Sequence, residues 1–345
     1  MTLHLRSGGT SLVLDTPSDR FPVVRHWGAD LGDIDGGALS GAARAQATTL
    51  GENSAWMCND LPILPHASLG WSARPAIGLH RVDGTAFSFH PSRVSHEPAG
   101  AATDAAGQEG QPRAVVSTAV DEAHGVTIVS EIRLEPSGLV RARATVTNEP
   151  GGRAELAGDL VVDEITPMLP LPQGADEILD MSGHHINERR LQRHRLTAGT
   201  HLRESWEGRP GHDATTWLAA GRSGFGWRSG TVHGVHLAWS GSTRSLIVSP
   251  SHGRSLLGAG ELLAFGEVLL APGESYASPW AVFSWGEGLD ALAHRSHAFL
   301  RSRPSHPERP RPVLLNTWEA VYFDHRLDKL LALAELAAGV GIERF

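Results

Sequence analysis

Apolar and polar residues alternate in short runs from the start of the chain to about Ser284, and turn residues separate these runs. The clearest pair is 126–134 and 140–146, joined by Pro136-Ser137-Gly138, with apolar residues on one face and arginines on the other. This alternation predicts antiparallel strands with one buried face, and their number predicts a large β-sandwich. Further strands are predicted at 231–239, 245–249, 262–270 and 281–284.

The spacing of apolar residues changes at Gly288, where it becomes helical and continues to Arg301. Residues 304–312 then contain four prolines, which remove backbone donors and exclude a helix or a central strand. We expect one helix packed against the sheets, followed by a linker.

After the linker, 313–316 predicts a short buried strand, and apolar residues between 330 and 337 predict a helix that ends near Gly339 or Gly341. Residues 342–345 begin another strand. A strand-helix-strand unit of this size cannot bury its own apolar surface, so we expect the natural polypeptide to continue into an α/β barrel. The predicted organisation is a β domain (1–285), a helix and Pro-rich linker (286–311), and the truncated start of a barrel (312–345).

Composition narrows the possible partners of the chain. Its 345 residues are 41% hydrophobic and 20% charged, which is typical of soluble globular proteins. The formal net charge of -8 excludes the basic field that a nucleic-acid partner needs. No stretch is apolar enough to span a bilayer, so we expect no membrane partner.

The cysteine content and the N-terminal residues indicate the compartment. Cys58 is the only cysteine, so no intramolecular disulfide can form. Residues 1–15 lack the unbroken apolar core of a signal peptide. We expect a cytoplasmic protein.

One long motif resembles a known family. Residues 312–324 read PVLLNTWEAVYFD and closely resemble the segment that opens the catalytic barrel of glycoside hydrolase family 36 α-galactosidases. The similarity continues to residues 341–345 and is also found upstream, at 209–213, 234–241 and 266–276. It therefore covers most of the chain.

The resemblance implies a β-supersandwich followed by a (β/α)8 barrel, and hydrolysis of terminal α-galactosides such as melibiose and raffinose with retention. A retaining glycosidase uses two carboxylates about 5 to 5.5 Å apart. In this family both come from later barrel strands, so no catalytic residue is expected before Phe345 and the chain alone should be inactive. The resemblance implies no metal and no cofactor. It does imply assembly into a homo-oligomer.

Three residues are candidates for substrate binding by the same resemblance. Trp318 matches a family tryptophan that lines the galactose pocket. The alternative interpretation is an aromatic residue of the barrel core without contact to substrate. Asp60 and Arg74 bracket a loop that resembles one reaching a neighbouring chain's active site in tetrameric members, although surface residues without a role are the alternative. Glu319 follows Trp318, and because adjacent strand residues face opposite sides we expect it to form a structural hydrogen bond.

Histidines and tryptophans suggest other chemistry, and each has a simpler explanation. His233 and His236 are three apart on a predicted strand and so face opposite ways, which argues against a shared metal. Most of the sandwich tryptophans are expected in the core or at interfaces, and the histidines at 184, 185 and 212 are expected to be isolated loop residues. The tryptophans leave one alternative function open, a non-catalytic carbohydrate-binding or oligomerisation β-sandwich.

Overall fold

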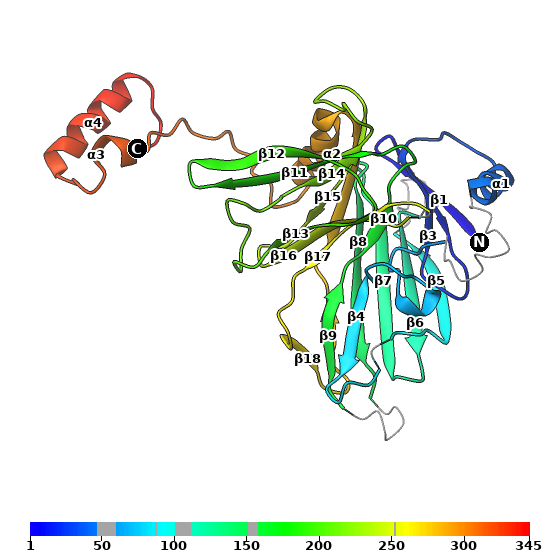
Figure 1. Ribbon diagram of the computed structural model, residues 1–345. Coiled ribbons are helices and arrows are strands. Elements are labelled where there is room, and N and C mark those ends of the chain that lie inside the picture. The colour runs from blue at the N-terminus through cyan, green and yellow to red at the C-terminus, as the bar shows by residue number, and fades with distance from the viewer. Residues whose placement is uncertain (47–59, 87, 101–111, 151–157, 252) are drawn as a thin grey trace, which may run out of the picture. The chain divides into compact units, whose positions relative to one another are not determined.

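A computed structural model of the chain describes all residues except 47–59, 87, 101–111, 151–157 and 252. Trp56 and Cys58 lie outside the described residues. The chain forms two compact units, unit 1 from Met1 to Phe299 and unit 2 from Leu300 to Phe345 (Figure 1). The domain boundaries that the sequence predicts, after residues 285 and 311, stay predictions.

The largest sheet of unit 1 is antiparallel and has ten strands, in the order β12-β11-β14-β15-β20-β8-β7-β6-β5, with β19 paired to β8 outside this path. Its strands are β5 (Arg93–Ala99), β6 (Ala114–Asp121), β7 (Val126–Leu134), β8 (Val140–Asn148), β11 (Glu177–His184), β12 (Asn187–Arg195), β14 (Leu218–Gly221), β15 (Thr231–Leu237), β19 (Ser275–Ala277) and β20 (Ala281–Glu287).

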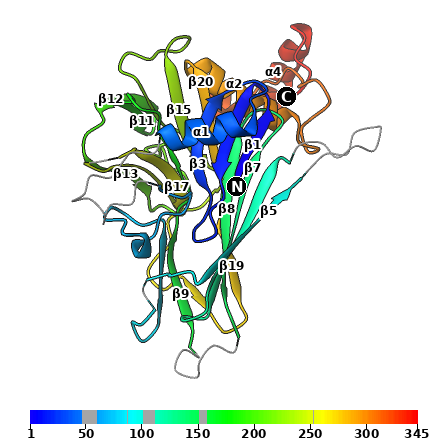
Figure 2. The ribbon, with the colours of Figure 1, turned by 90° about the vertical axis from the view of Figure 1, so that its right-hand side faces the viewer.

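Three smaller antiparallel sheets complete the strand structure of unit 1 (Figure 2). They consist of β1 (Thr2–Ser7), β2 (Thr10–Asp15) and β3 (Val23–Ala29); of β10 (Met168–Pro170), β17 (Leu256–Glu261), β16 (Thr243–Ser249) and β13 (Gly199–Ser205); and of β18 (Val268–Leu270), β9 (Leu160–Ile165) and β4 (Ile77–Arg81). The helices in the described part of this unit are α1 (Gly36–Gln46), the 3-10 turn η1 (Ala67–Leu69) and α2 (Leu289–Arg301), whose last two residues already belong to unit 2.

The β7–β8 hairpin forms as its sequence predicts. Val126 pairs with Asn148 and Leu134 with Val140, and the apolar positions of both strands are buried. The turn requires Gly138, which has a φ of +84° that side-chain-bearing residues rarely adopt.

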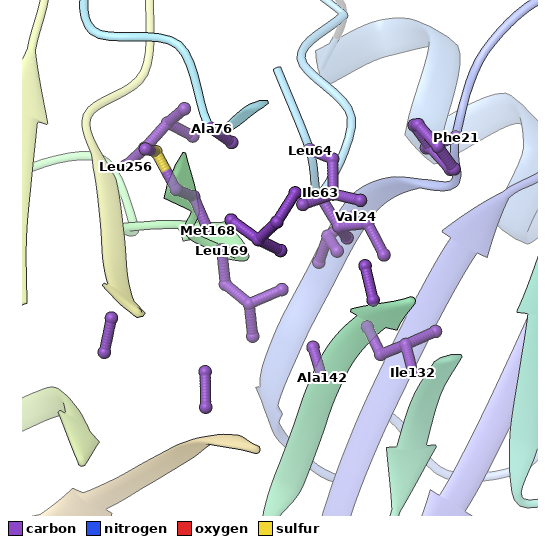
Figure 3. Packing of buried hydrophobic residues seen from close by; sticks show 14 of the residues in the cluster. Phe21, Val24, Ile63, Leu64, Ala76, Ile132, Ala142, Met168, Leu169 and Leu256 are labelled. Carbon is purple, nitrogen blue, oxygen red and sulfur yellow. The ribbon is translucent and has the colours of Figure 1, made fainter. Parts of the chain in front are cut away.

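One continuous apolar core joins the four sheets, which explains why so many short strands form a single unit. It includes Ile63, Ile132 and Met168, contributed by different sheets and by the loop after residue 60 (Figure 3). A second, smaller cluster around Leu292 lies beneath α2, as the helical spacing predicts. The predicted β-sandwich is confirmed.

The single strand predicted at 262–270 is wrong. Strand β17 ends at Glu261 and β18 begins at Val268, with a turn between them. Gly266 has a φ of +73°, and Glu267 closes the turn by donating its backbone N–H to the carbonyl of Ala264. Turn geometry therefore overrides the apolar run here.

Unit 2 contains α3 (Trp318–Val321) and α4 (Leu327–Gly339). The strand predicted at 313–316 is wrong in extent, because only Leu314 forms a bridge, a parallel one with Arg344. A parallel strand needs hydrogen-bonded neighbours, and the described residues of this unit supply a single bridge. The helix begins at Leu327, three residues before its first predicted apolar position.

Candidate functional site

Asp60 is held by an arginine of strand β3. Arg25 donates to Asp60 at 2.6 Å and to Asp15 at 2.6 Å, so one guanidinium joins the start of the loop to strand β2. This hydrogen bond lowers the pKa of Asp60 below its ordinary value. Asp60 is therefore a carboxylate at neutral pH, fixed in orientation at the surface.

Arg74 is held by a buried carboxylate. Its guanidinium donates to both oxygens of Glu164 on β9, at 3.1 and 2.6 Å. Arg244 on β16 lies 2.7 Å from the same carboxylate and also donates to Glu204 at 2.8 Å. Glu164 thus lies between two guanidiniums, and it is the residue that sequence reasoning missed.

The only sequence signal for Glu164 is its position in an apolar run, since residues 160–165 read LVVDEI and alternation places one acid on the buried face. Glu164 is 8% exposed. A buried carboxylate requires a charged or hydrogen-bonding partner, but the sequence does not say which arginine supplies it.

Trp318 opens α3 and is half-exposed, at 47% of its surface. The backbone N–H of Trp318 donates a hydrogen bond to the side-chain oxygen of Asn316 at 2.8 Å. Its indole makes edge-to-face contacts with Tyr322 and Phe323, whose ring centroids lie 5.6 and 5.0 Å away. An accessible aromatic surface of this kind can pack against the apolar face of a sugar.

Glu319 lies in the same short helix, so the expectation that Glu319 and Trp318 face opposite sides of a strand is wrong. Its carboxylate accepts a hydrogen bond from the Tyr322 hydroxyl at 3.1 Å. A local structural bond, as predicted, accounts for this side chain. Asp60 and Arg74 belong to unit 1 and Trp318 to unit 2, and their roles in substrate binding stay predictions.

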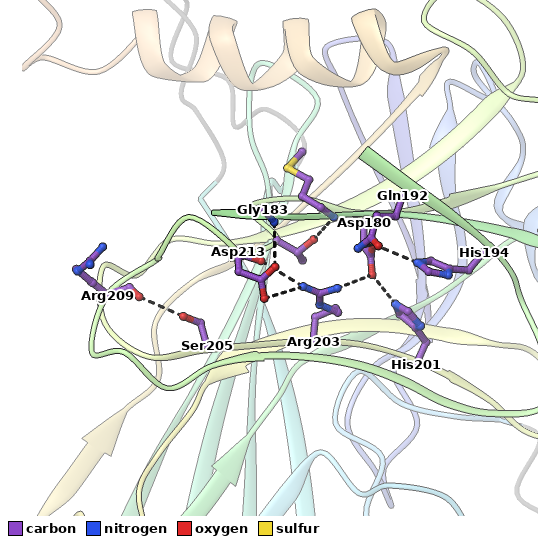
Figure 4. Close-up of polar contacts among 11 residues, drawn as sticks. Asp180, Gly183, Gln192, His194, His201, Arg203, Ser205, Arg209 and Asp213 are labelled. Carbon is purple, nitrogen blue, oxygen red and sulfur yellow. Dashed lines mark hydrogen bonds and ion pairs between the residues drawn. The ribbon is translucent and has the colours of Figure 1, made fainter. Parts of the chain in front are cut away.

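A second polar cluster lies between strands β11, β12 and β13 (Figure 4). The buried carboxylate of Asp180 contacts His201 at 2.9 Å, His194 at 3.3 Å and Arg203 at 3.4 Å. Burial alone would raise the pKa of Asp180, but the hydrogen bond from His201 and the charge of Arg203 lower it. The cluster joins three strands and is fully satisfied by protein groups.

The histidines after β11 and near residue 212 are not isolated, contrary to the sequence prediction. The rings of His185 and His212 lie 5.9 Å apart, and His212 lies 3.7 Å from Glu188. Asp213 accepts a hydrogen bond from the Gly183 backbone at 3.0 Å. These contacts hold the β11–β12 hairpin against the loop that follows β13.

His233 and His236 lie on β15 and make separate contacts. His233 packs against Trp27, whereas His236 contacts the carbonyl of Thr216 at 2.7 Å. Within the described ranges, no three His, Cys, Asp or Glu side chains are arranged to hold a metal ion. None of the described helices is both long and apolar enough to cross a bilayer.

Comparison with known proteins identifies the family. Residues 20–271 match the model of the glycosyl hydrolase family 36 N-terminal domain, and residues 275–345 match the melibiase model. The chain belongs to glycosyl hydrolase family 36. The family-36 resemblance predicted from residues 312–324 and the upstream segments is confirmed.

Similar sequences include the alpha-galactosidase of Escherichia coli, 34% identical over 231 residues, which are 66% of this chain and 32% of that protein. The alpha-galactosidase AgaA of Geobacillus stearothermophilus is 27% identical over 213 residues, or 61% of this chain and 28% of AgaA. The family-36 chain therefore aligns with about a third of each of these relatives.

Solved structures show the same fold. The crystal structure of AgaA from Geobacillus stearothermophilus superposes with a TM-score of 0.78 at 21% identity, covering 99% of this chain and 49% of AgaA. The galactosidase domain of the alpha-galactosidase-sucrose kinase AgaSK gives a TM-score of 0.77 at 22% identity. This superposition covers 98% of this chain and 48% of that chain. This chain spans about half the length of these solved family-36 structures.

Proposed function

We propose that this chain is the N-terminal part of an α-galactosidase that hydrolyses terminal non-reducing α-D-galactosyl residues with retention. In this proposal unit 1 supports the barrel, unit 2 begins it, and Trp318 contacts the galactose. The two carboxylates that a retaining mechanism needs would come from barrel strands after Phe345. The chain by itself would be inactive.

The family match carries this proposal, and the relatives' names agree with it. Proteins named alpha-galactosidase match across half or more of the chain. Variants of AgaA have been solved in complexes with raffinose and stachyose, which makes α-galactosides of this size the substrates we propose.

The exposed surface of unit 2 supports its assignment as part of a larger barrel. Among its described residues only Val321 and Ala337 are both apolar and buried. Large apolar side chains are exposed along the whole unit, namely Leu300, Val313, Leu314, Leu315, Trp318, Tyr322, Phe323, Leu327, Leu331, Leu336, Val340 and Phe345. A soluble protein rarely leaves so many large apolar side chains of one short segment uncovered, and neighbouring barrel strands and helices would cover them.

Activity of the complete polypeptide tests the proposal. We expect it to release p-nitrophenol from p-nitrophenyl α-galactoside, and this chain alone to release none. Replacing Trp318 with Ala in the complete protein is expected to lower kcat/KM by about tenfold or more, because the galactose loses an aromatic face. Phe265→Ala, at an exposed aromatic residue of unit 1 outside any proposed sugar-binding surface, is the control and should leave kcat/KM unchanged.

Three exposed tryptophans favour a second candidate, a non-catalytic carbohydrate-binding sandwich. Trp206, Trp227 and Trp239 are 57%, 59% and 42% exposed. Calorimetric titration of this chain with galactose and raffinose separates the two candidates. Appreciable affinity would favour the binding module, whereas the enzyme proposal predicts essentially none.

We also propose that the protein is cytoplasmic and forms a homo-oligomer, in which the loop between Asp60 and Arg74 approaches a neighbouring chain. Light scattering on the complete protein tests the oligomer directly. If the complete protein is monomeric at all concentrations, the loop between Asp60 and Arg74 cannot approach a neighbouring chain, and this proposal is wrong.

A further inference from the structure

A cavity of about 500 Å³ lies in unit 1 where β3 meets the ends of β10, β14, β15 and β20. Its apolar walls come from Trp27, Trp285, Pro170 and Pro172. This volume is within the range of pockets that bind small organic molecules. None of the substrate-binding residues proposed above lines the cavity.

Arg254 lines this cavity, and no residue in the described part of the chain is its counter-ion. The guanidinium of Arg254 makes only long contacts, 3.4 Å to the carbonyl of Arg25 and 3.5 Å to that of Leu171, and its Nε has no partner. Among the described residues no carboxylate lies within ion-pair distance of it. Arginine keeps its charge at neutral pH, so a partly buried cation is left here without an anion among the described residues.

A buried histidine supplies an unused hydrogen-bond acceptor beside this cation. His233 is 3% exposed, and its Nε2 lies 3.3 Å from the carbonyl of Trp27. Burial lowers the pKa of His233 to about 4, so the ring is neutral and its Nε2–H donates to that carbonyl. Its Nδ1 is then an acceptor, and it has no partner.

The remaining polar groups leave the interior of the cavity positive. Arg222 lies at the rim and is exposed, and His26 lines the wall. Burial lowers the pKa of His26, and the charge of Arg254 lowers it further. Glu287 is the one acidic residue among the described residues of the lining, and its carboxylate already accepts a hydrogen bond from Thr231.

We propose that this cavity binds a small hydroxylated organic anion, either a carboxylate or a phosphate monoester. The anionic group would pair with the Arg254 guanidinium, which can donate to two oxygens at once. A hydroxyl of the ligand would donate to Nδ1 of His233. The apolar body would lie against the tryptophan and proline walls.

Three sugars that differ only in the group at carbon 6 test the proposal. Galacturonate and galactose 6-phosphate carry the negative charge, and galactose is the neutral control; inorganic phosphate tests for adventitious anion binding. Calorimetry on this chain is expected to show at least one charged sugar binding about tenfold or more tighter than galactose and than phosphate. Binding of one charged sugar but not the other identifies the anionic group.

Variants then assign the binding to this cavity. Arg254→Gln is expected to weaken binding of the charged sugar about tenfold or more, with Arg254→Lys intermediate. Arg195→Gln is the control, since Arg195 is exposed on β12 and makes no ion pair with a described residue. Glu287→Gln removes the negative charge in the lining that would repel the anionic ligand. It should therefore tighten binding of the charged sugar, by up to about fivefold.

Several results would overturn the proposal. They are the absence of binding by both charged sugars, equal affinity for galactose or for phosphate, and affinity that Arg254→Gln leaves unchanged. If Arg254→Gln does not fold, as judged by circular dichroism, Arg254→Lys and Glu287→Gln still decide, because they should shift affinity in opposite directions. No readout involves α-galactoside hydrolysis, so failure here is distinguishable from failure of the proposed function.

Discussion

Glu164 fixes Arg74 and Arg244 in place, and its own burial makes this arrangement costly to disturb. We expect Glu164→Gln to reduce the free energy of unfolding by about 3 kcal/mol, because it removes the carboxylate shared by two guanidiniums in a largely buried site. Glu131→Gln is the matched control. Glu131 also pairs with two arginines, but those are 45% and 40% exposed, and the expected loss is below about 1 kcal/mol. Equal losses in urea unfolding would contradict this account.

Two buried histidines make stability depend on pH. Burial lowers the pKa of both His66 and His233 to about 4, against an ordinary value near 6.5. The unfolded chain therefore binds protons that the folded chain does not, so stability falls as the pH drops from about 6.5 toward 4. Each histidine should lower the free energy of unfolding by about 2 kcal/mol when the pH changes from 7 to 5.

Urea unfolding at the two pH values tests this dependence. His66→Gln should reduce the loss between pH 7 and pH 5 by about 2 kcal/mol, because it removes one of the groups whose protonation is linked to unfolding. A midpoint that is the same at both pH values in the unmodified chain would show that these rings are not buried as neutral groups.

Among the strands and turns, the β7–β8 turn leaves no room for a side chain at Gly138. A Cβ at Gly138 would lie 2.8 Å from the carbonyl oxygen of Gly8 and would also collide with Thr10 and Arg295. Gly273 has a similar φ of +92° with open space around it. Gly273→Ala should therefore cost about 1 kcal/mol, from backbone strain alone, and Gly138→Ala a further 1 to 3 kcal/mol from overpacking. Similar losses in thermal unfolding would mean that the close packing at Gly138 is absent.

Strands were predictable where the alternation was strict and a turn was marked by Pro or Gly. The β7–β8 hairpin satisfies both conditions, and its register follows from them. The run at 262–270 is apolar without strict alternation, so the pattern could not reveal the turn at Gly266. The strand at 313–316 failed for a different reason, since parallel strands form only beside neighbours.

The candidate site was predictable only as far as the family motif extends. Trp318 and its surroundings follow from residues 312–324, whereas the partners of Asp60 and Arg74 come from strands far away in the sequence. Pairings such as Arg74 with Glu164, 90 residues apart, depend on how four sheets assemble. No local pattern contains that information. The cavity beside Arg254 was missed for the same reason.

Taken as a whole molecule, the chain combines a well-packed β unit with a short unit whose apolar side chains are mostly exposed. The central claim is that this second unit opens a barrel that cleaves α-galactosides. Proton NMR of the complete polypeptide acting on raffinose tests this claim most directly. We predict that galactose is released first as the α-anomer, because a retaining mechanism preserves the configuration. Absence of cleavage, or initial release of the β-anomer, would contradict it.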